Sequence, residues 1–185
     1  MYARSVEINA VGDLVLSDPA AMRALGDSDR LTLHDRLRRE GASTVAELAA
    51  SLDAKHADVQ ERLRILEAAG LVERDGPRWS VVGKGIFVQI PDDPEGQEAA
   101  RQLSNTMLLQ YVDLPRRWVA EREPRLTLEW ARAAGLFNAR VTLTPDELGE
   151  LQERLEELLA PYLTRDVVPE AADDVRILAY FMPQG

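Results

Sequence analysis

Residues 43–82 have the sequence STVAELAASLDAKHADVQERLRILEAAGLVERDGPRWSVV, and this stretch decides the fold. Thr44 and Glu47 have the spacing of a capping box, which predicts that a helix begins at Thr44. Apolar residues then recur at helical spacing along one face: Val45, Leu48, Ala49 and Leu52. Asp53 and Ala54 interrupt the pattern, so we expect the helix to end there.

A second helix is predicted over residues 55–69. Its apolar residues share one side: Val59, Leu63, Leu66 and Ala69. Gly70 suits the C′ position just beyond a helix, and Leu71 supplies the apolar contact that commonly follows. Asp75-Gly76 then breaks an alternating segment, which predicts a hairpin. Two helices joined by a short turn and followed by a hairpin are typical of a winged helix-turn-helix, whose second helix enters the major groove of DNA.

Neighbouring segments extend this pattern over residues 18–85. Residues 21–41 are AMRALGDSDRLTLHDRLRREG, residues 44–52 are TVAELAASL, and residues 59–74 are VQERLRILEAAGLVER, with Arg78-Trp79 in the hairpin. Together they resemble the arsenical-repressor-like (ArsR) family of bacterial transcription regulators. The resemblance implies a homodimeric DNA-binding protein, a repressor or an activator, often controlled by a ligand. Of the two we favour a repressor.

The sequence departs from that family at two places. Asp53 occupies the turn position that is usually glycine. The second helix opens with Lys55-His56-Ala57-Asp58, where the family usually has small polar residues. The resemblance therefore does not imply a particular operator sequence.

Composition bounds the class of protein. A chain of 185 residues with 45% hydrophobic residues is long enough for one large or two small domains with a proper core. It has no cysteine, which excludes disulfides and thiolate metal sites. No apolar run approaches the roughly 18 residues of a membrane span, and the first residues lack the apolar core of a signal peptide. We therefore expect a cytoplasmic protein with no membrane partner.

Net charge at first argues against DNA binding. The formal charge is −10, whereas affinity for DNA depends on neutralising phosphates. However, residues 91–185 hold ten basic and eighteen acidic residues, while residues 18–90 hold eleven and twelve. The excess acid thus lies mostly outside the helix-turn-helix. Basic residues on the second helix and the hairpin are expected to form a positive stripe: Lys55, Arg62, Arg64, Arg74, Arg78 and Lys84.

The expected partner is a double-stranded DNA operator, and the contacts are assigned by chemistry. Gln60 and Arg64, on the outer face of the second helix, have side chains that bind base edges. Thr44, at a helix N-terminus, and the hairpin arginines suit phosphates, which position a protein without determining sequence. The predicted DNA-binding residues are Thr44, Lys55, His56, Asp58, Gln60, Glu61, Arg64, Arg74, Arg78 and Lys84. The alternative is a winged-helix protein-interaction module that does not bind DNA.

The predicted DNA-binding domain covers residues 1–90. Pro19 suits the first position of a short helix, and another helix is predicted over residues 28–40. We expect His34 to lie on a solvated face of that helix. A short strand or a hairpin is expected within residues 5–16, and a last strand at residues 86–90.

A linker, PDDPEG at residues 91–96, separates this domain from a second one, residues 94–185. A long helix is predicted from Pro94 to Glu121, and Pro115 must kink or end it. Its apolar stripe is either a dimer contact or intrachain core: Ala100, Leu103, Met107, Tyr111, Leu114 and Trp118. The residues assigned to dimerisation are Leu103, Met107, Tyr111, Leu114 and Trp118.

The second domain is predicted to continue as strand, helix and strand. Residues 137–143 alternate apolar and polar, Thr144 opens a helix with a second capping box, and residues 175–182 form an apolar strand. The predicted fold class is α+β and mainly helical, with an N-terminal winged helix-turn-helix and a small C-terminal α+β unit for dimerisation and effector binding. A pocket for a small apolar effector is weighed against simple core packing of the aromatics: Tyr111, Trp118, Trp130 and Phe137.

Other functions lack the residues they need. With no cysteine, and with His34 and His56 on different predicted helices, we expect no metal site and no cofactor. His56 lies where DNA contacts are predicted. Neither histidine is accompanied by a nucleophile elbow or a glycine-rich phosphate loop, so we do not expect an enzyme.

Overall fold

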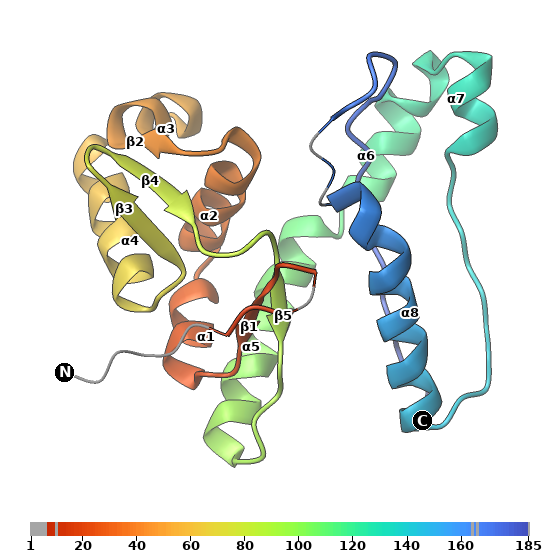
Figure 1. Cartoon of the computed structure of the whole chain (residues 1–185), viewed down its shortest axis with the longest axis horizontal. Helices are drawn as coiled ribbons and strands as arrows, with labels where there is room; N and C mark the ends of the chain where they lie inside the picture. Colours follow the sequence, from red (N-terminus) through yellow and green to blue (C-terminus); the bar gives the residue numbers. More distant parts are fainter. Residues whose placement is uncertain (1–6, 10, 164, 166, 185) are drawn as a thin grey trace. The chain divides into compact units, whose positions relative to one another are not determined.

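The structure is a computed structural model that describes residues 7–9, 11–163, 165 and 167–184. The chain has an α+β fold in which helices predominate (Figure 1). Its contacts divide it into two compact units, Met1–Leu143 and Thr144–Gly185. Each unit is described by itself.

Two capped helices open the first unit. α1 (Pro19–Leu25) begins after Asp18, whose side chain accepts a hydrogen bond from the Ala20 amide at 3.0 Å. α2 (Ser28–Glu40) begins after Asp27, whose carboxylate accepts from the Arg30 amide at 3.0 Å. Such side chains satisfy amides that have no partner inside the helix. Both predicted helices are confirmed.

Residues 45–68 fold as two helices, α3 (Val45–Leu52) and α4 (His56–Ala68). The predicted capping box is present: the Glu47 amide donates to the Thr44 hydroxyl at 3.2 Å, and the Thr44 amide donates to the Glu47 carboxylate at 2.7 Å. Asp53 ends α3 in the left-handed region, with φ 50°, which explains why glycine suits this turn.

Gly70 ends α4 as predicted. It has φ 75°, and its amide donates to the Glu67 carbonyl at 2.9 Å. The Leu71 amide donates to the Leu66 carbonyl at 2.9 Å, so the two bonds make a Schellman motif. Leu71 is fully buried and starts the next segment inside the core.

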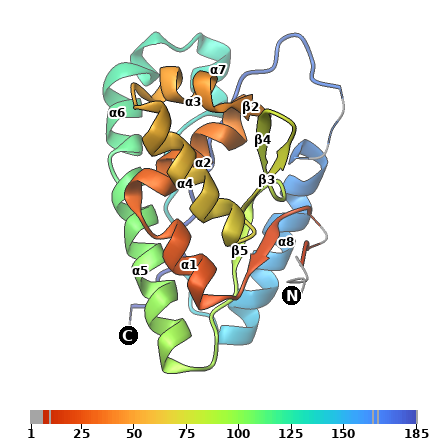
Figure 2. The same ribbon diagram turned by 90° about the vertical axis from the view of Figure 1, so that its left-hand side faces the viewer.

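A three-stranded sheet follows, in the order β2-β4-β3. β2 is Ser43–Thr44, β3 is Val72–Asp75 and β4 is Arg78–Val81, and both pairings are antiparallel. The predicted hairpin is confirmed, with its turn one residue later than expected, because Asp75 still pairs with Arg78. In Figure 2 the hairpin lies alongside α4.

A separate two-stranded sheet joins the N-terminal segment to the end of the hairpin region. β1 (Leu14–Leu16) runs parallel to β5 (Ile86–Val88). Gly83 allows this close approach, because a Cβ there would lie 2.8 Å from the Leu14 amide nitrogen. The strands predicted around these residues are confirmed in the described part of the chain.

Helix α5 (Pro94–Tyr111) belongs to the first unit. Ala99, Ala100 and Leu103 are buried in the same apolar cluster as Met22 and Leu25 of α1. The structure therefore corrects the predicted boundary at residues 91–96. That linker has the composition of a domain boundary, but the helix after it packs back onto α1.

The predicted interruption at Pro115 is confirmed. α5 ends at Tyr111, and α6 (Leu114–Glu121) has Pro115 in its first turn, where its missing amide costs nothing. A short 3-10 turn, η1 (Glu123–Arg125), and α7 (Leu128–Ala133) complete the helices of this unit.

The second unit contains α8 (Pro145–Leu163), which begins at the predicted capping box, with the Thr144 amide donating to Glu147 at 2.7 Å. The strands predicted at residues 137–143 and 175–182 are wrong: neither segment belongs to a strand. Alternation indicates which side chains a strand would bury, but a strand also needs a hydrogen-bonding neighbour. The predicted helix-strand-helix-strand unit is therefore not formed.

Among the described residues, no helix combines the length and the apolar character needed to cross a bilayer.

Candidate nucleic-acid interface

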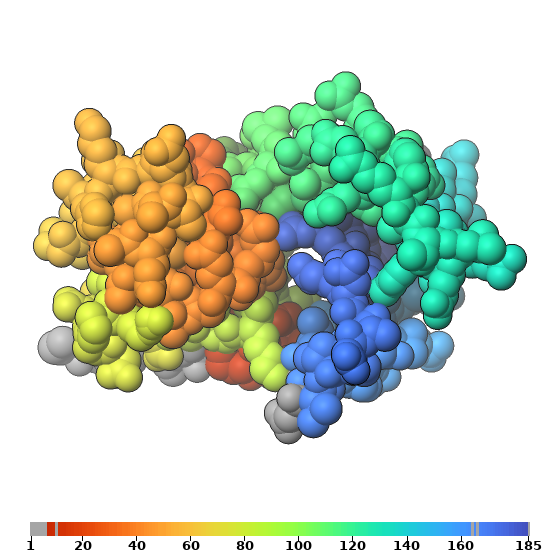
Figure 3. Space-filling view, turned by 90° about the horizontal axis from the view of Figure 1, so that it is seen from above, coloured from red at the N-terminus to blue at the C-terminus, as the bar shows by residue number. Residues whose placement is uncertain are grey.

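The outer face of α4 is polar because its inner face is fully committed to the core. Val59, Leu63 and Leu66 have no exposed surface. With 3.6 residues per turn, the intervening positions must face outward. Six of the predicted DNA-binding residues are accordingly exposed on or next to this helix: Lys55, His56, Asp58, Gln60, Glu61 and Arg64. In the space-filling view, the surfaces of α3, α4 and the hairpin adjoin one another (Figure 3).

Arg64 is tethered loosely on this face. Its Nη1 lies 3.5 Å from a carboxylate oxygen of Glu61, and about two thirds of each side chain is exposed. An exposed ion pair of this kind contributes little to stability, because solvent screens it and two long side chains must be ordered. Arg64 can therefore leave Glu61 for a base or a phosphate at small cost. Glu61 places a negative charge on the same exposed face.

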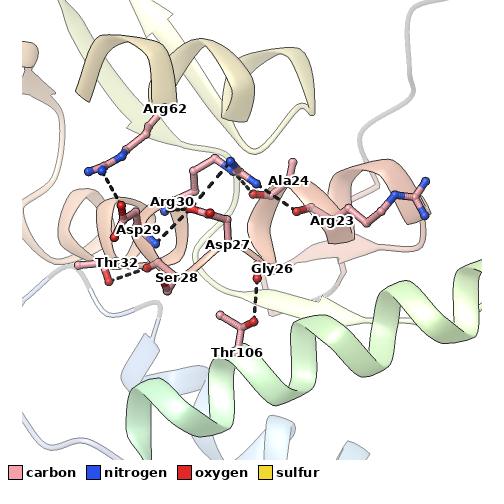
Figure 4. Close-up of polar contacts among 10 residues, drawn as sticks. All are labelled: Arg23, Ala24, Gly26, Asp27, Ser28, Asp29, Arg30, Thr32, Arg62 and Thr106. Atoms are coloured by element: carbon pink, nitrogen blue, oxygen red, sulfur yellow. Dashed lines mark hydrogen bonds and ion pairs between the residues drawn. The ribbon is translucent and has the colours of Figure 1, made fainter. Parts of the chain in front are cut away.

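Arg62 does not belong to the outer face, which corrects the predicted positive stripe. Its Nη2 lies 2.5 Å from Oδ2 of Asp29, in the first turn of α2 (Figure 4). The Arg62 side chain is 27% exposed. Its guanidinium therefore joins α4 to α2.

The hairpin carries two exposed arginines, each held by a contact within the chain. Arg74 Nε donates to the Gly76 carbonyl at 2.8 Å, and its guanidinium carbon lies 5.6 Å from the centre of the Trp79 ring. Arg78 Nη1 lies 3.4 Å from the Glu47 carboxylate. Lys84, just before β5, is also exposed.

Thr44 is a poorer phosphate ligand than the sequence suggests. Its hydroxyl donates to the Glu47 carboxylate at 2.9 Å and accepts from the Glu47 amide. Hydrogen bonds to the Glu47 carboxylate lower its pKa below the usual value. The bond from the Thr44 amide has the larger effect, and the bond from the Thr44 hydroxyl has the smaller one. An ionised carboxylate therefore occupies the helix N-terminus where a phosphate was predicted to bind.

The prediction of a solvated His34 is wrong. Only 2% of this residue is exposed, and burial lowers its pKa to about 4. Nε2 has no hydrogen-bond partner, so the imidazole is neutral in the core. Helical spacing carried a signal of this burial, because Leu31 and Leu37, three residues before and after His34, are buried on the same face of α2.

Next to His34, Asp35 forms the centre of a polar cluster between α2 and the end of α5. Its carboxylate accepts from the Tyr111 hydroxyl, from Gln110 Nε2 at 3.2 Å and from Arg38 Nη2 at 3.3 Å. Sequence analysis did not predict this cluster, because Gln110 and Tyr111 lie 75 and 76 residues from Asp35 in the chain. Tyr111 is consequently a link between α2 and α5.

The turn between α1 and α2 is a second hub that sequence analysis missed. Thr106 of α5 donates its hydroxyl to the Gly26 carbonyl at 2.7 Å (Figure 4). Arg30 of α2 reaches back to the Ala24 carbonyl. Asp29, the second residue of α2, accepts a hydrogen bond from the Arg62 guanidinium of α4. Helices α1, α2, α4 and α5 therefore meet at this turn.

The predicted effector pocket is not formed by its four aromatic residues. Phe137 is 92% exposed, and the Tyr111 hydroxyl is directed to Asp35. Trp118 and Trp130 are half-buried on α6 and α7. Because Phe137 touches almost nothing and Tyr111 belongs to the α2–α5 link, the four rings do not line one cavity.

The predicted dimerisation stripe is largely intrachain. Leu103 has no exposed surface and Met107 packs against the core, while Leu114 and Trp118 are half-buried. The opposite side of α5, together with its C-cap residue Val112, carries three exposed apolar residues that were not predicted: Leu108 (45%), Leu109 (67%) and Val112 (52%). An alternative helix face is therefore available for a partner.

The chain matches no known family model and no curated protein sequence. The resemblance to ArsR regulators therefore rests on the residues themselves.

Proposed function

We propose that residues 14–88 are a winged helix-turn-helix and that the protein is a homodimeric, sequence-specific DNA-binding transcription regulator acting as a repressor. One observation carries the proposal: α4 is wholly buried along one side and polar and exposed along the other, directly beside a hairpin with exposed arginines. The order of helices and strands from α1 to β4 is the order that this class of domain requires.

In this proposal α4 is the recognition helix. Gln60 can donate and accept in a bidentate pair with adenine, and Arg64 can donate twice to guanine. Arg74, Arg78 and Lys84 neutralise phosphates on either side of the groove. Asp58 and Glu61 disfavour phosphates nearby and restrict the orientation in which the helix can enter.

The charges limit the affinity. Arg64 and Arg78 must each leave a carboxylate before they bind DNA, and Arg62 is held by Asp29. Few phosphates are therefore neutralised per subunit, and we expect moderate affinity that falls with salt. A second subunit doubles the contacts and places two recognition helices on half-sites about 34 Å apart.

The proposal is tested by capturing genomic DNA fragments with the purified full-length protein and sequencing them. Recovery of a shared, two-fold symmetric site, followed by fluorescence anisotropy showing tighter binding to that site than to shuffled DNA, is the expected result. Uniform recovery of all fragments, or none at 50 mM salt, overturns it.

The protein-interaction alternative is favoured by one specific observation. The outer face of α4 is almost neutral, with its exposed arginine facing Glu61. Two results together support this alternative. The protein binds no DNA at low salt, and its Gln60→Ala and Arg64→Ala variants lose a protein partner. DNA binding with a clear salt dependence excludes it.

A further inference from the structure

Strand β5 has a free edge. The Leu14 amide donates to the Gly85 carbonyl at 3.0 Å, and the Gln89 amide donates to the Leu16 carbonyl at 3.1 Å. Because backbone groups alternate in direction along a strand, those of Ile86 and Val88 point away from β1. The far side of β1 is already occupied by Ile8, which leaves β5 as the outer strand of this sheet among the described residues.

Two apolar side chains beside that edge are exposed to solvent. Phe87 is 41% exposed and Ile90, two residues beyond the strand, is 66% exposed. An outer strand with apolar side chains is a template for another strand, which proteins usually cover or protect with charge. Lys84 lies at its beginning, and Asp92 and Asp93 follow its end.

The C-terminal segment, residues 175–182, also has exposed apolar side chains. Its sequence, VRILAYFM, is rich in residues that favour strands, yet it belongs to no strand in the described part of the chain. Its apolar side chains remain exposed: Val175 (59%), Ile177 (59%), Tyr180 (47%) and Met182 (68%). Asp173 and Asp174 stand directly before it.

We propose that this C-terminal segment of one chain adds to the free edge of β5 in a second copy of the chain. The inference rests on the proposed homodimer and names its contact. Addition of a strand supplies backbone hydrogen bonds to Ile86 and Val88 and covers Phe87 and Ile90. Reciprocal exchange closes the dimer, because each copy offers one edge and one segment.

Charge decides the direction of the pairing. In a parallel arrangement Asp173 and Asp174 lie near Lys84, and the uncharged end of the segment lies near Asp92 and Asp93. An antiparallel arrangement brings the two acidic pairs together, which destabilises a sheet, and Arg176 supplies only one positive charge against these four negative ones. The added strand is therefore parallel to β5. With Asp174 opposite Lys84, Phe87 faces Ile177 and Ile90 faces Tyr180.

The absence of cysteine from the sequence gives a direct test. Full-length Phe87→Cys carrying an affinity tag is mixed with untagged Ile177→Cys, and the mixture is oxidised. Each chain has one thiol, so a disulfide between Cys residues of the two variants must join two molecules. A mixed dimer on a non-reducing gel is expected for this pair and for Ile90→Cys with Tyr180→Cys. Ile90→Cys with Val175→Cys is the matched control and cross-links only in antiparallel pairing.

The outcomes separate the two proposals. Sedimentation showing a dimer without any of these cross-links overturns the strand addition and leaves the homodimer intact. Preferential cross-linking of the control pair overturns the parallel arrangement. A chain carrying both Phe87→Cys and Ile177→Cys that closes within a monomer overturns the exchange between copies. DNA binding, measured by anisotropy on the same unoxidised samples, reports on the proposed function independently.

Discussion

Arg62 of α4 and Asp29 of α2 form a direct ion pair, with Nη2 2.5 Å from Oδ2. The arginine is mostly buried by its surroundings, whereas 63% of the aspartate side chain is exposed. Of the two arginines in α4, Arg62 is the one that lies toward the core, and this pair holds it there. The pair therefore joins α4 to α2 and keeps Arg62 off the exposed outer face of α4.

We expect Asp29→Ala to weaken operator binding even though it removes a negative charge. A purely electrostatic effect has the opposite sign, because loss of an acid favours association with a polyanion. Arg62→Ala is expected to behave alike, and each change should lower the free energy of unfolding by about 0.5–1 kcal/mol. Denaturant titration and anisotropy measure both effects. Glu67→Ala, which removes an exposed acid elsewhere on α4, is the control, and tighter binding by Asp29→Ala refutes the positioning role.

Gln60→Ala and Arg64→Ala should relax sequence preference. Each loses about 1–3 kcal/mol of discrimination at one base pair if its contact is bidentate, with little change in stability. Glu61→Gln should tighten binding to all sequences, because it releases Arg64 and removes a repulsive charge. Competition binding against single-base variants of the operator measures this. Equal losses on operator and random DNA contradict base recognition.

Arg78→Ala should weaken binding to operator and random DNA alike. As a phosphate contact it contributes to counterion release, so the slope of log affinity against log salt should decrease by about 1 per site. Anisotropy at several salt concentrations checks this value. An unchanged slope shows that Arg78 stays paired with Glu47 in the complex.

His34 predicts how stability changes with pH. Its pKa is about 4 when folded and about 6.5 when unfolded, so only the unfolded chain takes up a proton between these values. Stability therefore falls as pH decreases from about 6.5 to 4, by up to about 3 kcal/mol for this group. The comparison of urea midpoints at pH 7 and pH 5 should show a smaller loss for His34→Asn. An identical loss in both proteins assigns the acid sensitivity to other groups.

Leu109→Asp should impair dimerisation if the exposed face of α5 contributes to it. Leu109 is 67% exposed within one chain, so the change has little reason to unfold the subunit. In a dimer contact it buries a charge, which is strongly unfavourable. Sedimentation equilibrium measures the dissociation constant. Leu128→Asp, at a residue of similar exposure (66%) on α7, is the control. A dimer unaffected by Leu109→Asp excludes this face.

Local signals in the sequence predicted the first half of the chain well. Thr44 with Glu47 located a helix start, and Gly70 a helix end, because caps depend on neighbours in sequence. Asp53 adopts the left-handed conformation that the family pattern implies for that position. Each of these features is determined by a few adjacent residues.

Features that depend on distant partners were not predictable. Arg62 was placed in the positive stripe because nothing near it in the sequence indicates Asp29. Alternation at residues 137–143 predicted a strand, but no pattern within those residues supplies a neighbouring strand. The linker before α5 likewise looked like a boundary, although Leu103 packs with α1.

The parallel pairing of Leu14–Leu16 with Ile86–Val88 has a consequence for synthesis on the ribosome. The chain emerges from its N-terminus, so β1 cannot pair with β5 until helices α1 to α4 and the hairpin have been made. During that interval Leu14 and Leu16, both almost fully buried in the finished protein, are exposed. The closing step joins residues far apart in the chain, which makes it slow relative to helix formation. A nascent chain released before Val88 lacks the strand that completes this sheet, and we expect it to be a substrate for chaperones.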